Sequence, residues 1–348
     1  MFVILLFLLF FISLAAIFED EIADKKIYVF IFLGIILALV CGLRPIGLDN
    51  DSKNYEITYT NYDDDLYLLT VEYSFLLISR FLNIFTSDAH AILVLYAFLG
   101  VGLKLYGIKK LSPSLFLPLI IYFGNYFLLH EMTQIRAGVA CGFFLISLKY
   151  LAEGEKKKAM LLWVCATFFH YSSLILFSLL LFSNKTLSRR WKIVLLSIVP
   201  ISYIFYFANI NIITALPLPY IQDKIEIYQD LKDFEGVGED INVFNLVFLV
   251  KILVFVYLLA MYDTVYKHNK NLPIMLKIMG LSIASFVMLA PLPVLSFRVS
   301  EVFGVVDIIL YANIYYTIKP DKLSRLIVVF IGCVLFAVNL FKIELFEF

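Results

Sequence analysis

The main pattern along the chain is a series of long apolar runs separated by short polar segments. A membrane-spanning helix needs about 20 mostly apolar residues, and only helices or closed barrels satisfy every backbone hydrogen bond inside a bilayer. The runs lack the roughly ten-residue alternation of a barrel strand, so they predict helices. We therefore expect an all-α, polytopic helical bundle with about ten full spans, near residues 2–17, 27–43, 89–106, 114–130, 132–151, 192–210, 243–262, 274–295, 297–317 and 326–343.

One further apolar stretch, residues 159–183, does not fit a simple crossing. Both of its flanks are basic, and basic loops favour the cytoplasmic side of a membrane. Its centre is interrupted by the polar run from His170 to Ser173. We expect a bent, re-entrant element that turns at His170, with this side chain in a polar cavity, because irregular backbone at such depth needs protein or water around it. A crossing at residues 71–85 would place every later basic loop on the wrong side of the membrane. We therefore expect these residues to form an interfacial helix on the outer side.

The charged residues between the runs predict the orientation of the bundle. Two long segments, at about 44–88 and 211–242, carry most of the acidic residues and are expected on the outer face. We treat residues 1–348 as a single transmembrane domain. Residues 1–17 have no Lys or Arg ahead of their apolar run, which favours a retained first span over a cleaved signal peptide. The basic residues expected in the cytoplasm are Lys109, Lys110, Lys156, Lys157, Lys158, Arg189, Arg190, Lys192, Lys267, Lys270, Lys319, Lys322 and Arg325.

Composition supports a membrane protein and excludes several function classes. Of the 348 residues, 62% are hydrophobic and 16% are charged, against about 45–50% and 25% in an ordinary soluble domain. A soluble enzyme is excluded, because a folded globule of this size cannot hide so much apolar surface. The net charge is zero, which gives no reason to expect a nucleic-acid partner. The four cysteines lie in apolar runs without CxxC spacing, as buried hydrophobic residues do.

Two arginines, Arg136 and Arg298, each begin a predicted span at the outer face. A cation in the first turn of a helix is unfavourable by up to about 1 kcal/mol, because the helix dipole is positive there. Both positions are explained if an anion lies between them, since helix N-termini and guanidinium groups suit phosphate. The alternatives are that each arginine extends to water or pairs with a carboxylate, Glu131 or Glu301.

Lys251 and Asp307 lie deeper in their predicted spans. At 1.5 Å per residue, each is roughly 12–14 Å from the outer face. Matching depth and opposite sign predict a structural ion pair between neighbouring helices, with a proton relay as the alternative.

The first outer segment combines aspartates with Tyr and Asn, a composition typical of sugar-binding surfaces. Asp49 lies close to the membrane and Glu72 begins the interfacial helix, so we expect both carboxylates at one cavity. Aspartates can also bind a divalent cation, but we expect the run from Asp63 to Asp65 to be solvated. The candidate sugar contacts are Tyr55, Asn125 and Tyr126.

A set of short motifs in a fixed order resembles the EpsG-like branch of the Wzy-type polysaccharide polymerases. The resemblance covers roughly residues 28–180 and extends weakly to Arg298. Gln134 precedes Arg136 here, where family members usually have Gln after the arginine, and only Phe303 remains of an aromatic pair after the late arginine. The motifs are Gly47-Leu-Asp49 with Tyr55, then Glu72, Gln134-Ile-Arg136 with Ala140, Phe169-His170-Tyr-Ser-Ser173, and Phe297-Arg298.

The resemblance implies an inner-membrane glycosyltransferase with a fold like the large multi-span lipid-sugar transferases. Such an enzyme lengthens an O-antigen or exopolysaccharide at the periplasmic face from repeats carried on undecaprenyl diphosphate. It implies no metal and no cofactor, and a chain-length regulator as a further partner. In this scheme Arg136 and Arg298 hold the diphosphate. The base is His170, Asp49 or Glu72, and His170 ranks first because its unperturbed pKa is about 6.5.

Two other function classes are consistent with the same pattern. A flippase or transporter of lipid-linked oligosaccharide also has broken helices and intramembrane charges. An O-antigen ligase or acyltransferase is likewise a multi-span protein with a site on the outer face.

Overall fold

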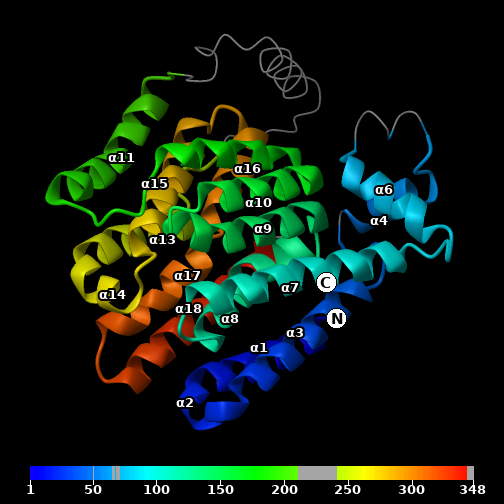
Figure 1. The fold of residues 1–348 in the computed structure, drawn as a ribbon, viewed down its shortest axis with the longest axis horizontal. Helices are drawn as coiled ribbons and strands as arrows, with labels where there is room; N and C mark the ends of the chain where they lie inside the picture. The colour runs from blue at the N-terminus through cyan, green and yellow to red at the C-terminus, as the bar shows by residue number, and fades with distance from the viewer. Residues whose placement is uncertain (50, 65–66, 68–70, 211–240, 343–348) are drawn as a thin grey trace. The chain divides into compact units, whose positions relative to one another are not determined.

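The computed structural model describes residues 1–49, 51–64, 67, 71–210 and 241–342, and the regular elements in these ranges are all helices (Figure 1). This confirms the all-α prediction for the described part of the chain. The chain divides into two compact units, each described separately below. Unit 1 comprises Met1–Asn184, Asp263–Asn271 and Asp307–Phe348, and unit 2 comprises Lys185–Tyr262 and Leu272–Val306.

Unit 1 is built around three long helices that pack in sequence. The helix α7 lies between α3 and α9, and α9 packs in turn against α10. The C-terminal helix α18 lies against the broken run formed by α8 and the π-helical segment η2. The elements are α1 (Phe2–Ile17), α2 (Glu19–Ile22), η1 (Ala23–Lys25), α3 (Lys26–Gly42), α4 (Ser52–Thr60), α6 (Tyr73–Leu82), α7 (His90–Leu111), α8 (Phe116–Tyr122), η2 (Phe123–Glu131), α9 (Ile135–Ala152), α10 (Lys156–Phe169), η3 (Tyr171–Leu181), α14 (Tyr262–His268, whose first residue belongs to unit 2), α17 (Asp307–Ala312), η4 (Asn313–Thr317) and α18 (Asp321–Lys342).

Unit 2 contains α11 (Arg189–Phe207), α13 (Leu246–Ala260), α15 (Leu272–Met288) and α16 (Pro293–Gly304). A short chain of hydrogen bonds links α13, α15 and α16. The Lys251 Nζ donates to Ser282 Oγ at 2.7 Å, and this hydroxyl donates to the Ser300 carbonyl at 2.6 Å. The residue predicted to pair with Lys251, Asp307, belongs to unit 1, so their ion pair stays a prediction.

Five helices of the described chain are long and apolar enough to cross a membrane, or six if α13 and α14 form one span. The chain is therefore a membrane protein. Helix length alone does not support about ten full spans, because several apolar runs are broken. For example, residues 297–317 contain α16, α17 and η4 in place of one helix. The five are Glu19–Gly42, His90–Leu111, Ile135–Ala152, Arg189–Phe207 and Asp321–Phe341.

The predicted run 114–130 changes from α-helix to π-helix at Phe123. A Cβ at Gly124 would lie 2.2 Å from the carbonyl oxygen of Gly332 on α18, so only glycine permits this approach of the two backbones. The Asn339 Nδ2 on α18 donates to the Gly124 carbonyl at 2.9 Å. The irregular backbone is therefore satisfied by protein, as a bilayer requires.

The bend predicted at His170 is confirmed. The helix α10 ends there, where the backbone becomes extended (φ −154°, ψ 116°). The following 3₁₀ segment η3 packs back on α10, and the Lys156 Nζ at the start of α10 donates to the carbonyl of Leu180 near the end of η3 at 2.8 Å. The interfacial helix predicted at residues 71–85 is also present, as the shorter α6. Their depths in the membrane stay predictions.

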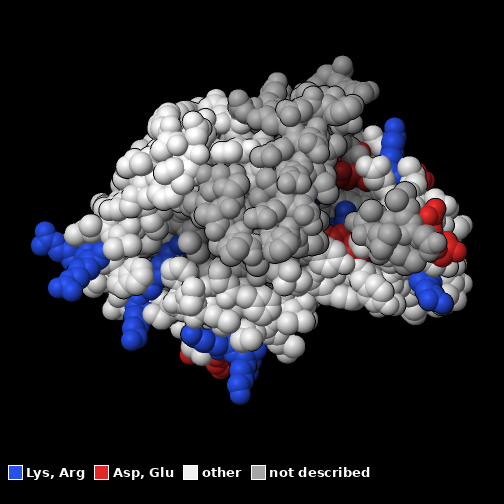
Figure 2. All heavy atoms as spheres, turned by 90° about the horizontal axis from the view of Figure 1, so that it is seen from above, with Lys and Arg blue, Asp and Glu red and all other residues white. Residues whose placement is uncertain are grey.

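The first predicted outer segment is partly helical, since it contains α4 as well as α6. Figure 2 shows Asp and Glu side chains gathered at the end of the visible face where Figure 1 places these two helices. The second predicted outer segment lies almost entirely outside the described residues, because residues 211–240 are not described.

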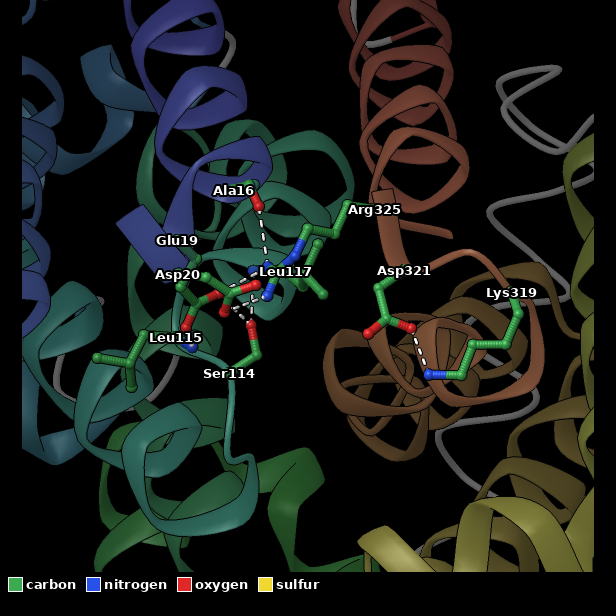
Figure 3. A network of polar contacts seen from close by, with 9 residues as sticks. All are labelled: Ala16, Glu19, Asp20, Ser114, Leu115, Leu117, Lys319, Asp321 and Arg325. Carbon is green, nitrogen blue, oxygen red and sulfur yellow. Dashed lines mark hydrogen bonds and ion pairs between the residues drawn. The ribbon is translucent and has the colours of Figure 1, made fainter. Parts of the chain in front are cut away.

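A second polar network joins α18 to the end of α1 (Figure 3). The Arg325 guanidinium donates to the Ala16 carbonyl at 3.1 Å and to Asp20 Oδ1 at 2.8 Å. The neighbouring Glu19 accepts a 2.5 Å hydrogen bond from Ser114 Oγ in the segment between α7 and α8. Arg325 and Glu19 are both buried. This network ties three parts of unit 1 together at the side predicted to be cytoplasmic.

Candidate active site

Three of the predicted site residues, Glu72, Arg136 and His170, meet in unit 1. Glu72 directly precedes α6, Arg136 lies in the first turn of α9, and His170 ends α10. The Arg136 Nη1 donates to Glu72 Oε2, and the His170 Nδ1 lies 2.8 Å from Glu72 Oε1. We call these three residues the Glu72 cluster. The carboxylate bridges a cation and an imidazole that are contributed by two other helices.

The cluster is buried at its carboxylate and partly accessible at its other two side chains. The Glu72 side chain is 8% exposed, His170 15% and Arg136 27%. A guanidinium has five N–H donors, and Glu72 uses only part of this capacity. Arg136 also hydrogen-bonds to Tyr55, and its partly exposed side chain keeps further N–H donors.

The electrostatics of the cluster determine the proton positions. Burial raises the pKa of Glu72, but the hydrogen bond with His170 and the charge of Arg136 together outweigh it, so the pKa is lower than usual. The carboxylate is thus ionised at neutral pH and can only accept hydrogen bonds. The His170 Nδ1 must then carry the proton in this contact. In the neutral ring, Nε2 is left as a proton acceptor.

An aromatic wall supports the arginine. The Arg136 guanidinium carbon lies 5.7 Å from the ring centre of Tyr55 and 6.0 Å from that of Phe75. Both rings belong to a buried apolar cluster that also contains Tyr59 and Tyr96. Cation–π contacts of this kind stabilise the charge and restrict the side chain. Tyr55 is only 6% exposed, so most of its ring surface is used in this packing.

Asp49 is held in a separate buried ion pair. Its Oδ2 accepts from Arg44 Nε at 2.8 Å, and both side chains are inaccessible to solvent. Its Oδ1 accepts from the backbone N–H of Asp51 at 3.1 Å and of Ser52 at 2.9 Å, at the start of α4. Asp49 therefore fixes the first outer segment. Sequence reasoning missed Arg44, although a cation five residues before an aspartate was a visible signal.

A second buried pair was missed entirely. The Lys104 Nζ on α7 lies 2.5 Å from Glu131 Oε1 and also donates to the Gly138 carbonyl of α9 at 2.7 Å. The Lys104 side chain is 0% exposed and that of Glu131 is 1% exposed. Glu131 was considered as a partner for Arg136, but Arg136 pairs with Glu72 in the described structure. The available signal was a lysine inside an apolar run.

The remaining predicted residues are on other elements, η2 and α16. The Asn125 backbone carbonyl accepts from Asn339 Nδ2 at 3.2 Å, and Tyr126 is 5% exposed with its ring 5.0 Å from that of His130. Arg298 lies exposed on α16 in unit 2. Roles in sugar or diphosphate binding stay predictions for these residues. Asp65 lies outside the described residues, and the described part holds no group of three metal-binding side chains.

Comparison with known proteins agrees with the resemblance found in the sequence. The amylovoran biosynthesis protein AmsC of Erwinia amylovora is 25% identical over 172 residues, which cover 46% of this chain and 46% of that protein. The chain thus matches less than half the length of this relative. No solved structure matches the chain significantly. The sequence model of the EpsG family matches residues 27–348, which is most of the chain. The chain therefore belongs to the EpsG family.

Proposed function

We propose that this protein is a membrane glycosyltransferase that polymerises oligosaccharide repeats carried on undecaprenyl diphosphate. The proposed product is an O-antigen or exopolysaccharide made at the periplasmic face of a bacterial inner membrane. Family membership and a relative named for amylovoran biosynthesis support this class of activity. The observation that carries the proposal is the Glu72 cluster, which combines an oriented imidazole with a partly accessible guanidinium.

The reaction needs a base and an anion site at neighbouring positions. The acceptor hydroxyl attacks the anomeric carbon of the growing glycan, the bond from that carbon to the diphosphate breaks, and the hydroxyl proton passes to His170 Nε2. A positioned base contributes about 10²–10⁴-fold to such a step. Arg136 stabilises the leaving diphosphate, an effect of about 3–4 kcal/mol for one preorganised donor. Glu72 positions both groups and keeps the imidazole in the required tautomer.

The broader parts of the proposal follow from the same scheme. Arg298 is the proposed second cation for the diphosphate, Asn125 and Tyr126 are proposed sugar contacts, and the buried Tyr55 is proposed to support Arg136 instead. The broken apolar runs are proposed to cross the membrane as linked short helices, which brings the number of crossings to about ten. We keep a chain-length regulator as a proposed partner.

The test is complementation of a deletion strain, with the surface glycan separated on a gel. Loss of a polymerase leaves single repeats, loss of a flippase leaves none outside, and loss of a ligase leaves long chains on the carrier lipid. We expect single repeats from His170→Asn and long chains from the control His90→Asn, because among the described residues the His90 ring contacts Asp88 beside its own helix start and the Arg44 carbonyl. Normal chain length from His170→Asn at normal protein level would contradict the proposed base.

A further inference from the structure

A groove of about 290 Å³ runs between α3 and α7 in unit 1. These two helices pack side by side (Figure 1), and each belongs to a segment long and apolar enough to span a membrane. Apart from one lysine and a tyrosine, all the residues that line the groove are apolar or glycine. The groove is therefore an apolar surface depression between two adjacent helices, each of which is able to span a membrane.

The length of the groove matches one leaflet of a bilayer. Its lining extends along α3 from Ile27 to Ala38, which is about 16 Å at 1.5 Å per residue. Half of a hydrocarbon core about 30 Å thick is about 15 Å. One acyl chain that starts at the membrane surface therefore fills the groove and ends near the bilayer centre.

Lys109 is the charged residue at one end of the groove, where the segment before α3 carries both acidic and basic residues (Glu21, Asp24 and Lys25). Lys109 lies in the last turn of α7, and Lys110 follows. The antiparallel α3 begins at this end, directly after Lys25. The Glu72 cluster packs near the opposite end of α7, where Tyr96 contacts Phe169. The lysines at the mouth suit a lipid phosphate, and the groove is separate from the proposed polymerisation site.

Two glycines shape the groove in different ways. A Cβ at Gly34 would lie 2.2 Å from the Leu105 Cδ1, so this glycine permits the close packing of α3 on α7. A Cβ at Gly102 would meet no atom within 4 Å, because Gly102 faces the open groove. A larger side chain at this position fills the groove without a clash.

We propose that this groove binds one acyl chain of an anionic phospholipid, with the lipid phosphate on Lys109. The lipid comes from the leaflet at the basic end of α7, which the positive charge predicts to be the cytoplasmic one. The occupant is a phospholipid of this leaflet and not the glycan carrier, whose diphosphate is used at the opposite end of α7.

The test is native mass spectrometry of the full-length protein with equal amounts of phosphatidylglycerol and phosphatidylcholine. One lysine near a membrane surface contributes about 1 kcal/mol toward an anionic lipid, so we expect Lys109→Gln to lower the phosphatidylglycerol preference about five-fold. The exposed Lys157→Gln is the matched control and should keep the wild-type preference. Gly102→Leu should remove the bound lipid whatever its headgroup, whereas Val164→Leu, on an exposed face of α10, should not.

Thermal unfolding of each variant in detergent shows whether it is folded, and Lys109→Gln tests the charge independently of the filled groove. Retention of the lipid by folded Gly102→Leu would overturn the proposal. An unchanged headgroup preference in Lys109→Gln would also overturn it. Displacement of phosphatidylglycerol by equimolar undecaprenyl phosphate would overturn the choice of a phospholipid.

Discussion

Replacing Glu72 by Gln tests the proposed role of the carboxylate with the least change in shape. The amide still reaches Arg136 and His170, but it carries no charge and can donate as well as accept. The His170 Nδ1 then no longer has to hold the proton, and the tautomer with a free Nε2 is no longer selected. The arginine also loses the charge that holds it in place.

The expected effect on rate is much larger than the effect on stability. Loss of a correctly oriented base costs on the order of 10²–10⁴-fold in rate. A hydrogen bond to a charged group contributes about 1.5–3 kcal/mol to stability. The Arg136 side chain is 27% exposed, so water recovers part of this and we expect a loss of about 1–2 kcal/mol. A typical folded protein, with about 5–15 kcal/mol of stability, tolerates that loss.

The assay is the rate of chain extension by purified protein given lipid-linked repeats, measured beside thermal unfolding in the same detergent. Glu56→Gln is the matched control, because Glu56 lies exposed on α4. We expect wild-type rates from Glu56→Gln and a loss of at least a hundred-fold from Glu72→Gln, the lower bound for a lost base. A Glu72→Gln rate within a few-fold of wild type would refute the tautomer argument.

Three further outcomes are expected from the buried contacts. Because the pKa of Glu72 is lowered in the folded state, the ionised carboxylate stabilises the fold above its ordinary pKa of about 4.3, and this stabilisation is lost as the pH falls through the lower folded pKa. The unfolding temperatures of wild type and Glu72→Gln should therefore converge at that low pH. A difference that persists there would contradict this. Lys104→Met should lower the free energy of unfolding in detergent by about 3–5 kcal/mol, because it leaves the buried charge of Glu131 unpaired. The double variant Lys104→Met with Glu131→Leu should lower it much less. Equal losses in the two variants would show that the unpaired charge is not the cause. Gly124→Ala should cost about 1–3 kcal/mol by forcing two backbones apart, whereas Gly102→Ala, which faces open space, should be neutral in the same measurement.

The sequence predicted the helices and the bend because both depend on local composition. A run of apolar residues specifies a membrane helix wherever its neighbours lie. The polar residues at His170 likewise predict a break in the helix, since polar groups without hydrogen-bond partners are unfavourable inside a bilayer. Helix continuity was harder to predict. The run that contains Gly124 is mostly apolar and predicts one continuous helix, yet its π-helical part lies where α18, more than two hundred residues away in the chain, approaches closely.

Partner choice was the part of the site that sequence could not supply. Arg136 and Glu72 were each singled out, but they are 64 residues apart, and the carboxylate considered as a partner for Arg136 was the nearby Glu131. The structure resolves the choice through burial. Lys104 enters the same region from α7 and takes Glu131, because a buried lysine needs a carboxylate nearby. The two cations and two carboxylates thus form separate pairs that depend on three-dimensional proximity.

These two pairs have a common consequence for the first turn of α9. Lys104 donates to the Gly138 carbonyl of this turn, and Glu72 accepts from Arg136 in the same turn. Arg136 differs from Arg325, which is also held by several contacts, because its side chain is 27% exposed against 6% for Arg325. Electrostatic catalysis requires an accessible donor that is held in this way, because a donor stabilises a leaving diphosphate most when it is already in place and needs no reorganisation. We therefore propose that Arg136 binds an anion in addition to its ion pair with Glu72.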